Sequence, residues 1–165
     1  MENRALTTDL LKGAVAGALA TWVMNWTTTR LYEQESDSVQ ERENEARGGQ
    51  SAYVTAAESL AASVGWALSD DAKGRGGTAI HWATGVVAGM KYAVFRRHWP
   101  KVATGFGLPF GVAFFLVVDE LMNPLLGLTP GPAEFPWQTH ARGLGGHLAF
   151  GAANEATLRV LDRVA

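Results

Sequence analysis

The sequence contains no cysteine, which excludes disulfide bridges, thiolate metal sites and cysteine nucleophiles. It also has no strong excess of charge of either sign, since its 165 residues carry a net charge of −2 at pH 7. A near-neutral chain with an acidic central run lacks the basic surface that nucleic-acid binding needs, so we expect no nucleic-acid partner. Charged residues are absent between positions 102 and 118 and dense between 33 and 47. The mean hydropathy of +0.00 therefore averages a polar segment with long apolar ones.

Glycine and tryptophan, by contrast, are abundant, with 19 and 6 residues respectively. Glycine is frequent in membrane helices, and tryptophan is enriched where the membrane meets water. The first apolar run is followed by Trp22, Asn25 and Trp26, which do not provide the small-residue cleavage site of a signal peptide. We therefore expect this run to be a retained transmembrane helix.

Apolar segments long enough to cross a hydrocarbon core about 30 Å thick occur four times. They cover about residues 10–32, 78–96, 102–122 and 140–161. Pro109 is expected to kink the third segment, because proline lacks a backbone N–H and its ring clashes with the preceding turn. Arg96, Arg97 and Lys101 crowd the short connection before that segment. The excess of basic residues in cytoplasmic loops predicts a multi-pass protein with this connection and both termini in the cytoplasm.

The connecting segments differ in character. Residues 33–51 are polar and acidic, which predicts a solvated loop or a fraying helix extension. Residues 52–68 have a helical composition, and we expect a helix on the membrane surface or packed on the bundle. The glycine-rich stretch 70–77 is predicted to be a turn. The predicted fold class is all-α: an integral membrane four-helix bundle with an additional surface or extramembrane helix, in a single domain over residues 1–165. A soluble helical bundle is the alternative.

Glycines spaced four apart occur in three of the four segments. Such pairs let helix backbones approach closely, because no side chain separates them. They also offer contact surfaces for a homo-oligomer or for another membrane subunit. The expected packing residues are Gly13, Gly17, Gly85, Gly89, Gly107 and Gly111.

Ionisable residues inside the apolar segments are the candidate functional residues. A charged side chain at the bilayer centre costs about 2.5–3.5 kcal/mol on insertion scales, so each needs a reason to be there. If the helix faces meet, they form a polar cluster that can hold a proton, relay it or bind a metal ion. The predicted cluster consists of His81, Asp119, Glu120, His147 and Glu155.

Structural alternatives stand beside this interpretation. His147 can form a helix–helix hydrogen bond, and Glu155 can pair with Arg159 one turn later. His81 can lie at the interface with water, and Asp119 and Glu120 can mark a helix end. A haem or a metal ion held by His81 and His147 is a further alternative. No catalytic residue and no other cofactor is predicted.

Several short motifs resemble the YagU-like family of bacterial inner-membrane proteins. These are HW-x2-GV from His81, Pro100 with Lys101, PLLGLTP at 124–130, Pro136 with Trp137, GHL at 146–148, and Glu155. The resemblance covers about residues 78–159. It implies an integral inner-membrane protein of a family of unknown function whose members are associated with survival under acid stress. His81, His147 and Glu155 are the positions that carry over.

From these features we expect a non-enzymatic protein of the bacterial inner membrane. Its partner is the lipid bilayer, and its role lies in envelope or acid-stress homeostasis. The polar cluster would pass or sense protons or a small solute, because an imidazole with an ordinary pKa near 6.5 responds where acid stress begins. The alternative functions are a structural or assembly subunit of a membrane complex and a haem- or metal-binding membrane protein.

Overall fold

The computed structural model describes residues 2–164, and within this range all regular elements are helices, joined by turns and loops. The long helices are α1 (Glu2–Tyr32), α4 (Asp70–His98) and α7 (Trp137–Val164). A fourth rod is made of η1 (Pro100–Gly107), α5 (Leu108–Phe115), η2 (Leu116–Met122) and α6 (Asn123–Leu125). Short elements complete the chain: α2 (Asp37–Arg47), α3 (Ala52–Ser63) and η3 (Pro132–Glu134). The all-α prediction is confirmed for this part of the chain.

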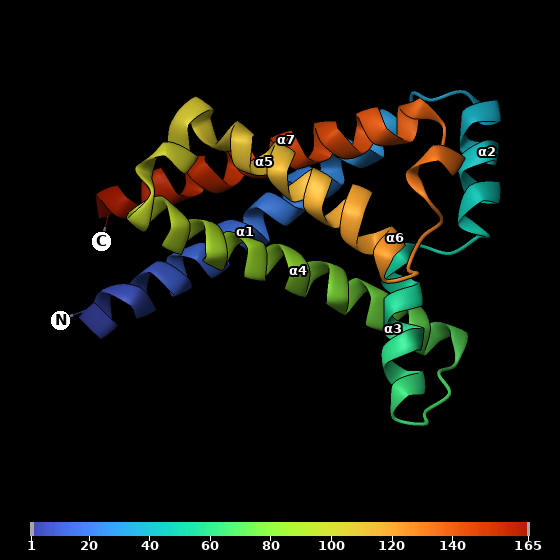
Figure 1. Ribbon diagram of the computed structural model, residues 1–165. Coiled ribbons are helices and arrows are strands. Elements are labelled where there is room, and N and C mark those ends of the chain that lie inside the picture. Colours follow the sequence, from blue (N-terminus) through green and yellow to red (C-terminus); the bar gives the residue numbers. More distant parts are fainter. Residues whose placement is uncertain (1, 165) are drawn as a thin grey trace.

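The long helices form a bundle in which α1 packs against both α4 and α7, while α5 packs against α7 and contacts α4 through Phe110 and Tyr92 (Figure 1). Both chain termini and η1 lie at one end of the bundle, which we call the terminal end (Figure 1). Helices α2 and α3 lie at the opposite end, which we call the distal end (Figure 1). Helix α3 packs on the first half of α4, so the predicted surface helix lies against the bundle and is shorter than the expected 52–68.

Helix α1 crosses α4 at two pairs of glycines. A Cβ atom added to Gly17 would lie 2.6 Å from the carbonyl oxygen of Gly85, and one added to Gly89 would lie 2.5 Å from the Cα atom of Gly17. Gly13 faces the Gly89 carbonyl in the same way. Such distances leave no room for any side chain, so the backbones touch.

A third glycine pair joins α5 to α7. A Cβ atom at Gly107 or Gly111 would collide with the backbone oxygens of Gly151 and His147, respectively. Gly107 also has a φ of 79°, a left-handed conformation that glycine adopts without steric cost. All six predicted packing glycines therefore make their close contacts within one chain.

The predicted kink at Pro109 is wrong, because Pro109 lies in the first turn of α5. A backbone N–H in the first turn of a helix makes no intrahelical hydrogen bond, so a proline there removes none. The chain instead bends before Leu108, where Gly105, Phe106 and Gly107 have positive φ angles. The third segment thus begins as a 3-10 turn, continues as an α-helix and ends in a π-helical stretch.

Two polar stretches form helices where the sequence predicts other structure. Most of the expected loop 33–51 is helix α2, which buries Val39 and Glu43. The expected turn at 70–77 is the start of α4. Its side-chain cap is Ser69, whose hydroxyl accepts from the amide of Ala72. Helix-stabilising acidic residues, Asp70 and Asp71, occupy its first turn.

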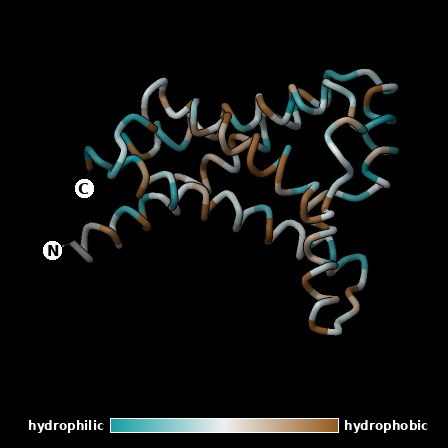
Figure 2. The backbone as a smooth tube through the Cα atoms, in the orientation of Figure 1, coloured by the Kyte–Doolittle hydropathy of each residue, from teal (hydrophilic) through white to brown (hydrophobic). Residues whose placement is uncertain are grey.

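The surface of the bundle is strongly apolar. Leu11, Val15, Leu19, Trp22 and Trp26 follow one face of α1 and are 49–65% exposed. Figure 2 shows hydrophilic residues concentrated in α2, with others near the ends of the long helices.

One helical rod in the described range, Pro100–Leu125, is long and apolar enough to cross a membrane, and 17% of its most apolar stretch is buried inside the molecule. Membrane spans through α1, α4 and α7 remain predictions.

Candidate functional site

A cavity of about 290 Å³ opens at the distal end, between α1, α3, α4, η2 and the start of α7. We call it the distal cavity. Its wall is rich in polar and ionisable side chains, which include Asn25, Tyr53, His81, Asp119, Glu120 and His140. The structure thus brings three of the five predicted cluster residues, His81, Asp119 and Glu120, to one cavity.

His81 reaches the cavity from α4. Its Nε2 lies 2.7 Å from Oδ1 of Asn25, and an amide oxygen can only accept, so Nε2 carries the hydrogen. Its Nδ1 is then the basic nitrogen. This atom is buried and has no hydrogen-bond partner among residues 2–164. The ring packs edge-on against Tyr53 at 4.7 Å between centroids. His81 therefore presents an unused proton acceptor at the cavity wall.

Tyr53 stays a neutral phenol beside this imidazole. Burial, together with the nearby negative charge of Asp119, raises the pKa of its hydroxyl well above the ordinary value of 10.0. Its hydroxyl can therefore donate or accept a hydrogen bond without losing its proton.

His147 lies directly behind the cavity, on α7. Its Nδ1 donates to the carbonyl oxygen of Gly143 at 2.9 Å and is 3.7 Å from Oδ2 of Asp119. The ring is 2% exposed and packs between Phe114 and Phe115, with centroid distances of 4.9 and 5.6 Å. The contact with Asp119 becomes an ion pair only when His147 is protonated.

His140 and Glu120 form the closest acid–base pair of the cavity. Nδ1 of His140 lies 2.6 Å from Oε1 of Glu120, and Nε2 lies 3.0 Å from the carbonyl oxygen of Pro132. The carbonyl can only accept, so Nε2 carries a hydrogen. A hydrogen must also lie between Nδ1 and the carboxyl group, whichever of the two owns it. The pair therefore holds one exchangeable proton.

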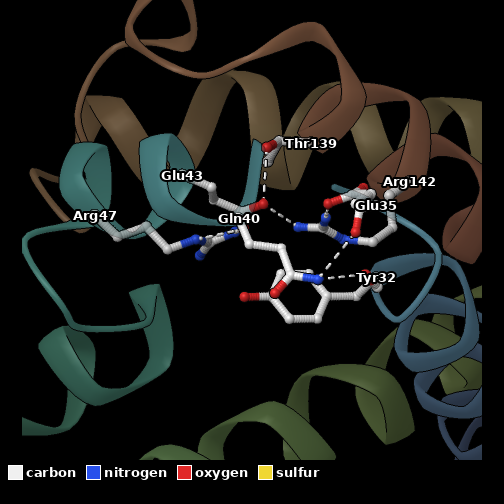
Figure 3. Close-up of polar contacts among 7 residues, drawn as sticks. All are labelled: Tyr32, Glu35, Gln40, Glu43, Arg47, Thr139 and Arg142. Atoms are coloured by element: carbon white, nitrogen blue, oxygen red, sulfur yellow. Dashed lines mark hydrogen bonds and ion pairs between the residues drawn. The ribbon is translucent and has the colours of Figure 1, made fainter. Parts of the chain in front are cut away.

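Helix α2 closes one side of the distal end through a buried ion-pair network (Figure 3). Arg142 on α7 donates to Glu35 at 2.5 Å and also to Glu43. Glu43 accepts further hydrogen bonds from Thr139 at 2.9 Å and from Arg47 at 2.8 Å. The guanidinium of Arg142 also lies over the ring of Tyr32, 4.9 Å from its centroid. One arginine thus ties α7 to α2 and to the segment after α1.

Charge governs the protonation of this network. Burial alone would favour the neutral acid, but the hydrogen bond from Arg142 and the charges of Arg47 and Arg142 outweigh it. They hold the pKa of Glu43 below its ordinary value of 4.5. Glu43 is 3% exposed, so it is a buried carboxylate that stays ionised because its cationic partners are in place.

Glu155 lies elsewhere, towards the terminal end, and does not join the histidines. It is 1% exposed and accepts from the hydroxyl of Tyr92 at 2.8 Å. Arg159 donates to it at 2.6 Å, which is the i+4 pair expected from the sequence as the structural alternative for Glu155. Arg96 lies 3.5 Å away. The predicted cluster is therefore divided, because His147 and Glu155 are two helical turns, about 12 Å, apart.

Phenylalanines fill the space between the two polar regions. Phe110 and Phe114 of α5 pack at 5.9 Å, and Phe150 of α7 lies 5.2 Å from Phe114 between ring centroids. Phe110 also contacts Tyr92 at 4.7 Å. We call Phe110, Phe114 and Phe150 the phenylalanine block. It separates His147 at one side from Tyr92 and Glu155 at the other.

The structure gives a haem or metal site at the histidines little support. Nε2 of His81 is engaged by Asn25 and Nδ1 of His147 by a backbone carbonyl. Within residues 2–164, no group of three or more histidine, aspartate or glutamate side chains is placed to hold a metal ion. The chemistry that the distal cavity supports is binding and release of protons or of a small polar solute.

Sequence reasoning missed His140, Arg142 and Glu43. His140 follows the Pro136–Trp137 loop and is the first residue of a predicted span. At that position the spacing of apolar residues does not show which way its side chain faces. One sequence feature could have indicated this site. His140 and Arg142 lie in the first turns of an otherwise glycine-rich apolar helix.

Comparison with known proteins gives a family but no activity. The model of a family described as a protein of unknown function (DUF1440) matches residues 57–156, which is more than half of the chain. No curated protein and no solved structure matches the chain.

Proposed function

The chain belongs to the DUF1440 family of proteins of unknown function, and from this premise we propose a function based on the distal cavity. We propose that the protein is a non-enzymatic component of the bacterial inner membrane that senses external acidity, taking up protons or a small polar solute at this cavity. The observation that carries the proposal is the contact of His140 with Glu120, which holds a proton at an opening of the molecule.

Membrane location is supported by the exposed surface. The apolar rod Pro100–Leu125 is mostly not buried in the molecule, whereas the core helix of a soluble protein would be. Leu19, Trp22 and Trp26 of α1 are similarly exposed. An apolar surface of this extent requires a partner, and lipid is the partner that surrounds a bundle on all sides.

Orientation follows from the terminal end. The basic residues Arg96, Arg97 and Lys101 lie in or next to η1, at the same end as both termini (Figure 1). We propose that this end faces the cytoplasm, in line with the excess of basic residues in cytoplasmic loops. The distal cavity then opens on the outer side, where an acid challenge arrives first.

Sensing is favoured over passage by the phenylalanine block. A proton pathway needs polar groups or water along its whole length, and three packed phenyl rings interrupt it between His147 and Tyr92. Protons taken up at the distal cavity change charge there without crossing the bundle. Protonation of His147 would create an ion pair with Asp119, and this couples proton uptake to contact between α7 and η2.

A role in acid-stress or envelope homeostasis is part of the proposal. It is supported by the resemblance of the motifs around His81 and His147 to a family associated with acid survival.

The proposed role in acid stress is tested in cells. Cytoplasmic pH and survival are followed after an acid challenge in a strain that lacks the protein and is complemented with wild type, His140→Gln or His147→Ala. We expect both variants to lose most of the complementation. His98→Gln is the matched control, because His98 is exposed and lies at the terminal end. Wild-type behaviour of both distal variants would overturn the proposal.

The alternative of an assembly subunit has less support. It was based on glycine pairs as partner surfaces, and these pairs make their contacts within the chain. A fixed partner or a homo-oligomer remaining bound during purification in mild detergent would revive it.

A further inference from the structure

A second, quite different opening runs along the side of the bundle. It is a groove of about 710 Å³ between α4 and the rod that contains α5. Its walls are almost wholly apolar and include Ile80, Val87, Phe95, Phe110, Phe114 and Val117. We call it the lateral groove. Several wall residues are partly exposed: Val87 is 45%, Phe95 40% and Val117 50% exposed.

The shape of the lateral groove suits a single chain of hydrocarbon. On α4 it extends from Ile80 to Phe95, which is about 22 Å at 1.5 Å per residue. Half of a hydrocarbon core is about 15 Å thick. The groove is thus long enough to hold one acyl chain through the whole thickness of one leaflet. Packing an acyl chain against the apolar wall is favourable, because wall atoms that face an empty groove lack dispersion contacts on that side.

One cation interrupts the apolar wall. Lys91 of α4 lines the groove near its terminal end and is exposed. Lys101 is not itself a wall residue, but it directly precedes the wall residue Val102 in the chain. Nearby Arg96 and Arg97 pair with Asp162 and Asp9, at 2.6 and 2.7 Å. Within residues 2–164, by contrast, no carboxylate pairs with Lys91 or Lys101.

We propose that the lateral groove binds one anionic phospholipid, with an acyl chain along α4 and α5 and the headgroup phosphate beside Lys91 and Lys101. The inference rests on the proposed membrane location. The charge complementarity favours an anionic lipid over a partner helix, because a lysine ammonium facing an apolar helix would be left without a counter-charge. The basic terminal end then faces the leaflet in which anionic lipids attract lysine.

The test uses the full chain, purified in mild detergent and examined by native mass spectrometry. Synthetic phosphatidylglycerol is the anionic probe, and zwitterionic phosphatidylcholine is the comparison. We expect wild type to retain one phosphatidylglycerol per chain under conditions that remove phosphatidylcholine. Lys91→Gln should weaken phosphatidylglycerol binding about fivefold, from the attraction of one lysine to an anionic headgroup, and Lys101→Gln should weaken it in the same direction.

Arg75→Gln is the matched control. It removes the same charge from the same helix, but Arg75 is 75% exposed, pairs with Asp71 and lies sixteen residues, about 24 Å, from Lys91 along α4, so lipid binding should not change. Equal retention of the two lipids by the folded chain, or unchanged binding in both lysine variants, would overturn the proposal.

The other occupants give separate results. The chain has no cysteine, so Ala113→Cys places a single thiol in the groove wall. Rapid disulfide dimerisation of this variant in membranes would mean that a second copy fills the groove, which contradicts a lipid. A chain that stays folded and dissolved without any detergent would instead refute the membrane location itself, and would do so independently of the lipid comparison.

Discussion

Nδ1 of His140 lies 2.6 Å from Oε1 of Glu120, and because Nε2 faces a carbonyl oxygen, the two side chains share one proton. The residues are twenty positions apart in sequence and meet only because the loop before α7 returns to the end of η2. A proton held at this point is close to Asp119 and His81 in the same cavity wall. The distal cavity therefore gathers several ionisable side chains at one opening.

Removing the carboxyl group should remove the shared proton. In Glu120→Gln the amide NH₂ can donate to Nδ1 of His140, so this nitrogen needs no hydrogen of its own. We expect ¹⁵N NMR of histidine-labelled protein to show Nδ1 of His140 without a hydrogen in this variant and with a shared hydrogen in wild type. Glu134→Gln is the control, because Glu134 is exposed in η3, and it should behave like wild type. The same Nδ1 signal in wild type and Glu120→Gln would show that the pair shares no proton.

The link between α2 and α7 should depend on Arg142. Arg142→Ala leaves the buried carboxylate of Glu43 without its main partner, and breaking a buried pair in this way costs about 3–5 kcal/mol. Hydrogen exchange should become faster throughout α2. Arg30→Ala is the control, because its pair with Glu33 is 59% and 54% exposed. We expect Arg30→Ala to lower the free energy of unfolding by less than about 1 kcal/mol. Protection of α2 that survives in Arg142→Ala would contradict the assignment.

The same network predicts how stability depends on pH. The pKa of Glu43 is lowered in the folded state from its ordinary value of 4.5. A lowered pKa means that the unfolded chain binds the proton more tightly. The stabilisation is therefore fully present above the unfolded value and is lost as pH falls through the folded value. Exchange protection of α2 should hold at pH 6 and decrease below about pH 4.5. In Glu43→Gln the decrease should be smaller, and an unchanged decrease would assign it to other groups.

Two glycine substitutions should change stability in opposite directions. A Cβ at Gly111 would collide with the backbone of His147, whereas nothing lies within 4 Å of one at Gly74. Gly111→Ala should destabilise the bundle by about 1–3 kcal/mol, as overpacking does. Gly74→Ala in α4 should stabilise it by about 0.5–1 kcal/mol. Thermal unfolding in detergent measures both, and a neutral Gly111→Ala would argue against the close contact of α5 with α7.

Opening the phenylalanine block should create a leak. Wild-type protein in liposomes is expected to pass few protons under an imposed pH gradient. Phe114→Ala removes the ring that contacts both His147 and Phe150, and proton flux should rise. Phe95→Ala is the control, because Phe95 is 40% exposed and outside the block. High flux through wild type would mean that the protein passes protons rather than senses them.

Much of the bundle follows from local sequence. The length of the apolar segments predicted α1, α4 and the third rod. The spacing of Gly13 and Gly17 predicted a backbone contact between helices. Both patterns can be recognised because they lie within a single helix. Helix α2 was missed because its stability depends on Glu43 meeting Arg142, ninety-nine positions later. The distance between His147 and Glu155 was predictable, because eight helical residues rise about 12 Å. Sharing a helix face does not bring two side chains together.

The most direct test of the account is ¹⁵N NMR of histidine-labelled protein in lipid vesicles. The hydrogen bonds predict opposite tautomers at neutral pH, with the hydrogen on Nε2 of His81 and on Nδ1 of His147. A stepwise fall in pH should then convert the ring of His81 to the imidazolium, with a hydrogen added at the unpartnered Nδ1. A mixture of tautomers at either ring, or a His81 ring that stays neutral until the protein unfolds, would contradict a cavity built to take up protons.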